Sequence, residues 1–150
     1  MEIKLPPDFS DFLKSLNATR ADYLLIGGYA VGFHGYPRTT DDFDVWVRAD
    51  AENAGRVVSA LRAFGFDVPA LQVSLFLKDD QIIRMGVPPQ RIEVMTTISG
   101  VTFNECWPGR VESKWDGVPV AIIGLECLRK NKRASGRLKD LADLEQLPKV

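Results

Sequence analysis

The sequence contains little that would place the protein outside the cell or in a membrane. Only two cysteines occur, Cys106 and Cys127, and they form no CxxC pair. We expect buried, reduced thiols, with a disulfide as the alternative in an oxidising compartment. Residues 1–7 lack the apolar core of a signal peptide, and no apolar run approaches the roughly 18 residues of a membrane span. These absences predict a cytoplasmic protein without a membrane partner.

Net charge and histidine are equally scarce. The 150 residues carry a formal net charge of −1, so no overall field draws the chain to nucleic acid or to an anionic membrane. A nucleic-acid ligand would need a local basic patch. His34 is the single histidine, and it has either a packing or capping role or a catalytic one. Its position beside Gly35 and Pro37 favours the packing or capping role.

The remaining composition is that of an ordinary globular domain. Hydrophobic residues make up 45% of the chain and charged residues 26%, and we find no repeat, linker or low-complexity tract. A chain of this length fits one domain. We therefore predict a single domain over 1–150, with a core over about 20–123 and C-terminal helices over about 125–147.

Apolar spacing predicts helices interleaved with strands. Asp50 is a suitable N-cap for the longest helix, and Gly65 ends it. The first two of three consecutive strands in the middle of the chain are expected to form a hairpin. Residues 87–89 are expected to separate the second strand from the third, and residues 100–117 are expected to form a turn-rich loop. Interleaving of this kind predicts an α/β or α+β sheet domain. The expected helices are 9–16, 29–34, 51–64, 125–134 and a short one ending at Leu147, and the expected strands are 23–26, 43–48, 72–78, 81–85, 91–96 and 118–123.

Two carboxylates share one face at the start of the strand predicted at 43–48. Side chains alternate between the faces of a strand, so Asp42 and Asp44 point away from the core face formed by Phe43 and Val45. Their Cα atoms lie about 7 Å apart, and the charges repel unless a cation lies between them. Mg²⁺ typically binds one or two carboxylates together with substrate phosphates. A metal site is one interpretation, and a solvated acidic strand end is the other.

A glycine turn precedes these aspartates in the chain. The apolar run 23–26 stops at Gly27-Gly28, and a helix is expected to follow. Backbone N–H groups at such a turn, together with a helix N-terminus, form a site for a phosphate. Glycine at a tight turn is also common without any ligand. The turn is a candidate phosphate site because a candidate metal site follows it closely in the chain.

Two more residues are candidates for the same face. Alternation in the strand predicted at 91–96 turns Glu93 outward, so Glu93 reaches the aspartates if the two strands pair. Without that pairing it is an ordinary exposed strand residue. Trp46 shares the face of Asp44. Its indole either stacks on a nucleobase or is covered by a neighbouring element.

The C-terminal helical region carries a basic cluster with two interpretations. Runs of this kind are usually a solvated helix face. In a chain with a net charge of −1, the cluster is also the obvious patch for a phosphate or for RNA. The two interpretations stay open at this point. The cluster consists of Arg129, Lys130, Lys132, Arg133, Arg137 and Lys139.

Two motifs in this order carry a resemblance to a known superfamily. Gly27-Gly28 followed by Arg38-x-Thr40-x-Asp42-x-Asp44 resembles the DNA polymerase β-type nucleotidyltransferases, especially the small bacterial branch of minimal nucleotidyltransferases and abortive-infection-type toxins. The stretch 132–143 resembles the Lys…Arg-x-Lys-Asp-x-x-Asp motif of that branch. The similarity spans about 22–147. It implies a polymerase β-like fold, a mixed twisted sheet flanked by helices, with a C-terminal helical segment.

The resemblance also implies a role for each matching position. Gly27 and Gly28 would hold a nucleoside triphosphate through their backbone amides. Asp42 and Asp44 would bind the metal. Glu93 stands where the superfamily commonly has an aspartate that positions the metal near the attacking hydroxyl. The implied catalytic residues are Asp42, Asp44, Glu93 and Lys132, the implied metal ligands are Asp42, Asp44 and Glu93, and the implied nucleotide-binding residues are Gly27, Gly28, Arg38, Thr40, Lys132 and Asp143.

Two functions follow as hypotheses. The first is an enzyme that uses Mg²⁺ or Mn²⁺ and an NTP substrate to move a nucleoside monophosphate to a hydroxyl. The acceptor would be an RNA 3′ end such as that of a tRNA, a protein side chain or a small molecule, in a setting with a cognate toxin or antitoxin partner. The second is a binding module that keeps the fold without turnover and acts as an antitoxin or nucleotide sensor. The extra methylene of Glu93 keeps the second hypothesis open.

Overall fold

One mixed sheet of six strands organises the protein, and the computed structural model describes residues 4–86 and 90–149. The strand order is β3-β4-β2-β1-β6-β5, with parallel pairing of β2 with β4 and of β1 with β6 and antiparallel pairing elsewhere. The strands are β1 (Tyr23–Ile26), β2 (Asp42–Val47), β3 (Ile82–Met85), β4 (Arg91–Met95), β5 (Val111–Trp115) and β6 (Val118–Ile122). The helices are α1 (Pro7–Ala18), α2 (Gly27–Phe33), α3 (Ala51–Phe64), the 3₁₀ helix η1 (Val73–Leu77), α4 (Phe103–Cys106), α5 (Leu125–Ser135) and α6 (Leu138–Gln146).

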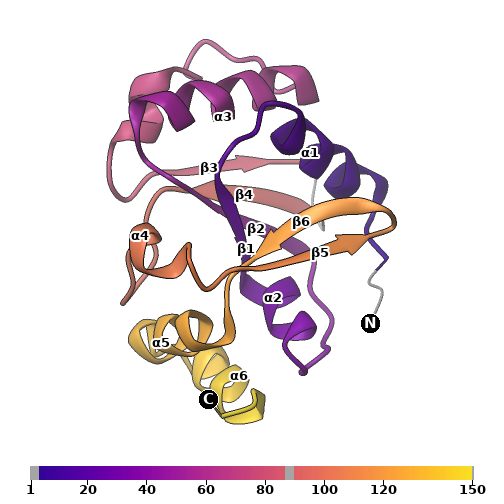
Figure 1. Ribbon diagram of the computed structural model, residues 1–150, viewed down its shortest axis with the longest axis vertical. Coiled ribbons are helices and arrows are strands. Elements are labelled where there is room, and N and C mark those ends of the chain that lie inside the picture. The colour runs from indigo at the N-terminus through magenta and orange to yellow at the C-terminus, as the bar shows by residue number, and fades with distance from the viewer. Residues whose placement is uncertain (1–3, 87–89, 150) are drawn as a thin grey trace.

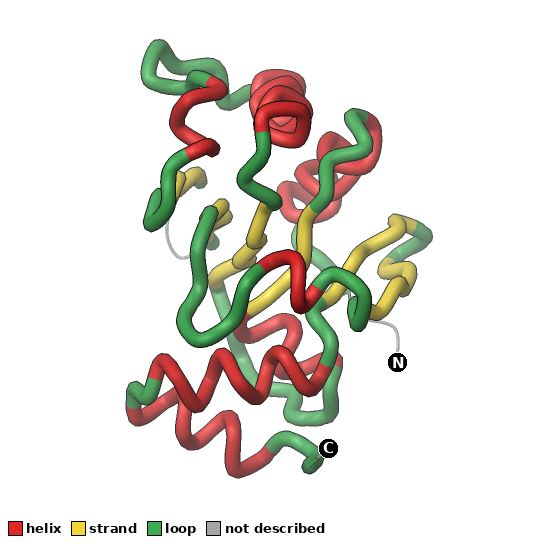
Figure 2. Tube along the Cα trace, turned by 60° about the vertical axis from the view of Figure 1, so that its left-hand side comes forward, coloured by secondary structure: helices red, strands yellow, loops and turns green. Residues whose placement is uncertain are grey.

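The helices lie on opposite sides of this sheet. Helices α1 and α3 pack together on one side, and α5 and α6 lie at the other end of the molecule (Figures 1 and 2). The predicted mixed sheet flanked by helices, with a C-terminal helical segment, is therefore confirmed. No helix among the described residues is both long enough and apolar enough to cross a membrane.

Helices α1 and α3 cover the core face of the sheet. The buried side of α1 includes Phe9, whose ring stacks on Phe43 of β2 with centroids 4.8 Å apart. The bounds of α3 match the predicted 51–64 because both of its ends are encoded locally. The Asp50 carboxylate accepts a hydrogen bond from the N–H of Asn53, and Gly65 adopts the left-handed conformation that ends the helix.

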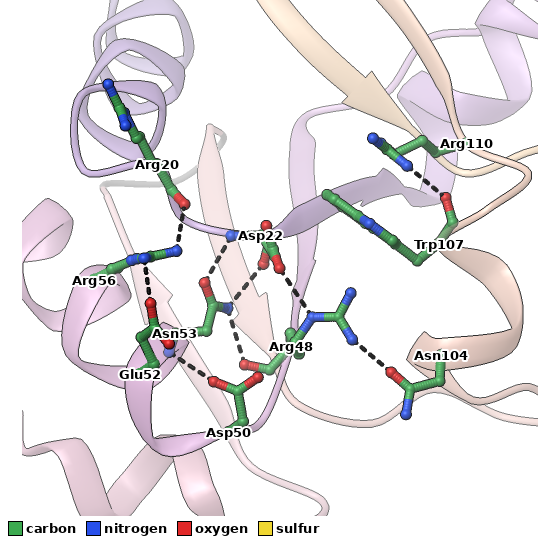
Figure 3. A network of polar contacts seen from close by, with 10 residues as sticks. All are labelled: Arg20, Asp22, Arg48, Asp50, Glu52, Asn53, Arg56, Asn104, Trp107 and Arg110. Atoms are coloured by element: carbon green, nitrogen blue, oxygen red, sulfur yellow. Dashed lines mark hydrogen bonds and ion pairs between the residues drawn. The ribbon is translucent and has the colours of Figure 1, made fainter.

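A buried asparagine joins α3 to the strands beside it (Figure 3). The Asn53 amide oxygen accepts from the N–H of Asp22 at 2.7 Å, and its nitrogen donates to the carbonyls of Asp22 and Arg48 at 2.9 Å. The Arg48 guanidinium in turn donates to the Asp22 carboxylate at 2.9 Å and lies over the ring of Phe103. These bonds fix the end of β2 that lies away from Asp42.

The predicted strand at 72–78 is wrong, and so is the hairpin built on it. The segment contains the 3₁₀ helix η1, in which Phe76 is buried while Val73 and Leu77 are exposed. The antiparallel partner of β3 is instead β4, with Ile83 opposite Val94. The predicted break at 87–89 lies outside the described residues.

The turn-rich loop predicted at 100–117 contains two short elements. Helix α4 begins with a capping box, in which Thr102 accepts from the N–H of Glu105 and Glu105 accepts from the N–H of Thr102. Strand β5 then pairs with β6. The helix expected at 29–34 begins two residues earlier than predicted, at Gly27.

Several open alternatives are settled by packing. Trp46 is 2% exposed, lies edge-on to Phe103 and donates from Nε1 to the Thr96 carbonyl at 3.2 Å, so it is covered and not free to stack on a base. His34 caps α2 and lies 2.7 Å from the Ile123 carbonyl, which agrees with a packing role. Both cysteines are free thiols, one buried and one half-buried.

Candidate active site

A cavity of about 510 Å³ lies between the polar face of the sheet and helices α5 and α6. Its floor comes from β2 and β4, its rim from the start of α2, and its far wall from α5 and the start of α6. Five of the residues expected from the sequence line it, namely Gly27, Asp42, Asp44, Glu93 and Lys132. Segments separated by about a hundred residues therefore meet at one place.

The three acids lie on adjacent strands because β2 and β4 pair in parallel. In this register Asp44 is directly opposite Glu93, and Asp42 is opposite Arg91. The alternation that buries Phe43 and the rest of the core face turns the acids toward the cavity. Strand pairing thus brings the side chain of Glu93 to the level of Asp44.

Asp44 is the most electrostatically perturbed of these acids. Its pKa is raised from 3.8 to about 7, chiefly by burial and then by the charges of Glu93 and Asp42, while Lys139 and Lys132 act in the opposite direction. One carboxylate oxygen, Oδ1, is buried and has no hydrogen-bond partner among the described residues. A buried carboxylate oxygen without a donor is costly unless a proton or a cation occupies it.

Glu93 is held differently from the two aspartates. Its Oε1 accepts a hydrogen bond from Nε of Arg84 on β3 at 3.0 Å. Within residues 4–86 and 90–149, no three His, Cys, Asp or Glu side chains are gathered closely enough to hold a metal ion by themselves. A cation at this site would therefore take Asp42 and Asp44 as its protein ligands and complete its shell from a bound substrate, as Mg²⁺ commonly does.

The glycine turn fits closely around the acids. Gly27 has φ +68°, and a Cβ at this position would collide with the Asp44 carboxylate. A Cβ at Gly28 would lie 2.7 Å from Oγ1 of Thr40 and 2.8 Å from its Cβ. Both glycines are therefore needed for close packing against the strand that carries the acids.

Four expected residues stand behind the cavity instead of lining it, namely Gly28, Arg38, Thr40 and Asp143. Thr40 packs on Gly28 and donates to the Asp42 carbonyl at 3.4 Å. Arg38 makes two hydrogen bonds of 2.9 Å to the two carboxylate oxygens of Asp143. This pair ties the segment before β2 to helix α6.

Lys132 lies inside a network of charges between α5 and α6. It is 4% exposed, and its ammonium lies 3.2 Å from Asp140 and 3.1 Å from Asp143. Arg137 also donates to Asp140, at 2.6 Å. Burial alone would raise the pKa of Asp140, but hydrogen bonds from Arg137 and Lys132 outweigh it and leave the pKa below its usual range.

The basic cluster thus has no single role. Arg129 donates to backbone carbonyls at the end of α6, and Lys130 pairs with Glu126 away from the cavity. The cavity wall also contains residues that were not expected as site residues, of which Arg137 and Lys139 had been noted only as basic. They are Arg84, Asn131, Arg137, Lys139 and Asp140. The C-terminal motif contains the last three of these residues, and no sequence signal marked Arg84 or Asn131.

Comparison with known proteins agrees with this fold. No family model and no curated protein matches the sequence. Among solved structures, the chain is similar to a “putative nucleotidyltransferase” from Thermotoga maritima, with a TM-score of 0.60 and 15% identity over 89% of this chain and 86% of that one. It is also similar to an “antigenic nucleotidyltransferase-like protein” from Paracoccidioides brasiliensis, with a TM-score of 0.55 and 18% identity over 92% and 72% of the two chains. The chain has the nucleotidyltransferase fold, as the sequence motifs predicted.

Proposed function

We propose that this protein is a metal-dependent nucleotidyltransferase that moves a nucleoside monophosphate from an NTP to a hydroxyl. The observation that carries the proposal is the buried Asp44 carboxylate, whose Oδ1 has no partner among the described residues and which lies beside Asp42 and opposite Glu93. Such an oxygen suits a hard divalent cation, Mg²⁺ or Mn²⁺. When bound, the metal would neutralise charge on the phosphates and on the attacking and leaving oxygens.

The protein's own residues would bind and orient the two substrates. Asp42 and Asp44 would hold the metal with the triphosphate, and Gly27 would let the phosphates approach the backbone at the start of α2. Glu93 would lie on the side of the acceptor. In the reaction the hydroxyl oxygen forms a bond to the α-phosphorus and gives up its proton to water, the bond from that phosphorus to the bridging oxygen breaks, and pyrophosphate leaves with its electron pair.

The acceptor and setting belong to the same proposal. The resemblance of the sequence favours an RNA 3′ end, such as that of a tRNA, or a protein Tyr, Ser or Thr as acceptor. It also favours a cognate toxin or antitoxin partner. These acceptors can be compared directly by incubating the protein with each labelled NTP, Mg²⁺ or Mn²⁺, and either total tRNA or cell lysate, and then following the label.

The central experiment measures pyrophosphate release together with label transfer. Asp42→Ala and Asp44→Ala should abolish both, because each variant removes a metal ligand. Asp41→Ala is the matched control, since Asp41 is exposed and does not line the cavity. Full activity in either of the first two variants would exclude the assigned site. Loss of activity in all three would indicate damage to the strand instead.

A second function is favoured by one observation, the hydrogen bond that engages Glu93 with Arg84. With Glu93 engaged in this way, and no three acids in the described part of the chain placed to hold a metal ion together, the protein would bind nucleotide without turnover and act as an antitoxin or nucleotide sensor. Glu93→Gln separates the two functions. It should lower transfer at least about tenfold in an enzyme, with Glu112→Gln as the exposed control. If the unsubstituted protein binds NTP and releases no pyrophosphate with any acceptor, the second function holds.

A further inference from the structure

Three cationic side chains face the proposed phosphate end of the cavity, and they differ in how many carboxylates they contact. Lys132, Arg137 and Lys139 all line the cavity wall. Lys132 is buried and contacts two carboxylates. Arg137 is exposed but makes two hydrogen bonds to Asp140. Lys139 is exposed, and among the described residues no carboxylate lies within ion-pair distance of it.

We infer that Lys139, with Arg137 beside it, contacts the β- and γ-phosphates of the nucleotide, and that Lys132 is a structural lysine holding α5 to α6. This inference rests on the proposed function, and it changes the assignment that sequence resemblance gave to Lys132. The contrast between a buried ammonium paired with two carboxylates and an exposed one with no carboxylate partner among residues 4–86 and 90–149, both at the same cavity, carries it.

The hydrogen-bonding capacity of Lys132 supports this division. An ammonium has three N–H donors; Lys132 donates a hydrogen bond to Asp140 and forms an ion pair with Asp143. Moving the Lys132 ammonium toward a phosphate would remove one of the two cations beside each of these buried carboxylates, which is unfavourable. Arg38 alone would then remain beside Asp143, and Arg137 alone beside Asp140. The lysine is therefore most stable where it is.

The position of Lys139 supports its assignment to the phosphates. It is the second residue of α6, directly after Arg137 and Leu138, at the end of the helix that meets the cavity. Its side chain lines the same cavity as Asp42 and Asp44. A flexible, strongly hydrated ammonium without a protein partner can reach a triphosphate at little cost. Arg137 adds a planar guanidinium next to it.

The test compares nucleotides that differ only in phosphate number. Binding of ATP, ADP and AMP, each with excess Mg²⁺, is measured by calorimetry for the unsubstituted protein and for Lys139→Ala, Lys132→Ala and the control Lys130→Ala. Lys130 is exposed, pairs with Glu126 and lies outside the cavity. Lys139→Ala should weaken ATP binding about 10- to 100-fold, the loss of one charge-assisted contact, and AMP binding less than about twofold. Its melting temperature should not change.

Lys132→Ala should give the opposite pattern. Its melting temperature should fall, because Asp140 and Asp143 lose the cation between them, and any loss of affinity should be similar for ATP, ADP and AMP. Lys132→Met, which keeps much of the side-chain volume, provides a second variant if the alanine variant does not fold. Lys130→Ala should match the unsubstituted protein throughout.

Two results would overturn the inference. One is ATP affinity in Lys139→Ala equal to that of the unsubstituted protein. The other is loss of the preference for ATP over AMP in a folded Lys132 variant but not in Lys139→Ala. Failure of the proposed function looks different, because the unsubstituted protein would then bind no nucleotide or would release no pyrophosphate.

Discussion

Replacing Asp44 with asparagine should make the protein more stable at alkaline pH, although it removes a proposed metal ligand. The pKa of Asp44 in the folded protein is about 7, compared with 3.8 for an ordinary aspartate, chiefly because the group is buried. The folded state therefore holds this proton more tightly than the unfolded chain. Its contribution to stability is fully present below pH 3.8 and is lost as the pH rises through 7.

The size of the effect follows from the shift. A displacement of about three pH units corresponds to a ceiling of about 4 kcal/mol above pH 7, at 1.36 kcal/mol per unit. Partial access of water reduces this to about 1–3 kcal/mol. Asparagine has nearly the same shape and no charge. We expect Asp44→Asn to exceed the unsubstituted protein by that amount at pH 8.5, and the difference to shrink to about a quarter of it at pH 4.5.

Urea unfolding in EDTA, measured between pH 4.5 and 8.5, checks this prediction. Other titrating groups are common to both proteins, so the difference between the two curves isolates Asp44. Asp41→Asn, at the neighbouring exposed acid, should follow the unsubstituted protein. Added Mg²⁺ should stabilise the unsubstituted protein above pH 7 and leave Asp44→Asn unchanged, since a ligand stabilises only the state that binds it. Parallel curves, or an asparagine variant that is less stable at pH 8.5, would refute the reasoning.

Three further predictions concern packing and can be checked by urea unfolding at neutral pH. Gly28→Ala should lower stability by about 1–3 kcal/mol, because its new methyl group would overlap Thr40; an unchanged free energy would mean that the turn is looser than described. Gly55→Ala, in the middle of α3 with no atom within 4 Å of the added Cβ, should instead raise stability by about 0.5–1 kcal/mol. Asn53→Ala should cost about 2–4 kcal/mol, since it removes three hydrogen bonds and leaves the N–H of Asp22 without its partner, while the Asp22 carbonyl keeps the N–H of Arg48; a loss below 0.5 kcal/mol, the usual scatter at surface sites, would contradict the role given to this network.

The features that could be predicted from the sequence are those that short-range patterns determine, such as helix bounds and strand faces. The bounds of α3 follow from an apolar stripe, an Asp N-cap and a terminal glycine, all within sixteen residues. The shared face of Asp42 and Asp44 follows from strand alternation alone. The segment at 72–78 shows the limit of that rule, because alternation does not say which set faces the core. Burial of Phe76 decided the conformation there, and that depends on contacts with α3.

The candidate site depended on pairings that no local pattern contains. Glu93 reaches the level of Asp44 only because β2 and β4 pair in parallel in one register. A slip of one residue would have turned Glu93 to the other face. Lys132 and Lys139 belong to the same basic run in the sequence. The packing of α6 on α5 buries one between two aspartates and leaves the other exposed at the cavity.

The charge network between Arg38 and helix α6 has a consequence for the order in which the chain is made. Synthesis runs from the N-terminus, so Asp42 and Asp44 leave the ribosome about ninety residues before the cations that face them across the cavity. Arg38 is likewise synthesised well before its partner Asp143, which lies 105 residues later in the chain. A nascent or prematurely terminated chain therefore carries the acids without the wall that opposes them. The cavity wall is therefore complete only after α6 has been made and has docked, so we expect no nucleotide transfer from a chain that stops before α6.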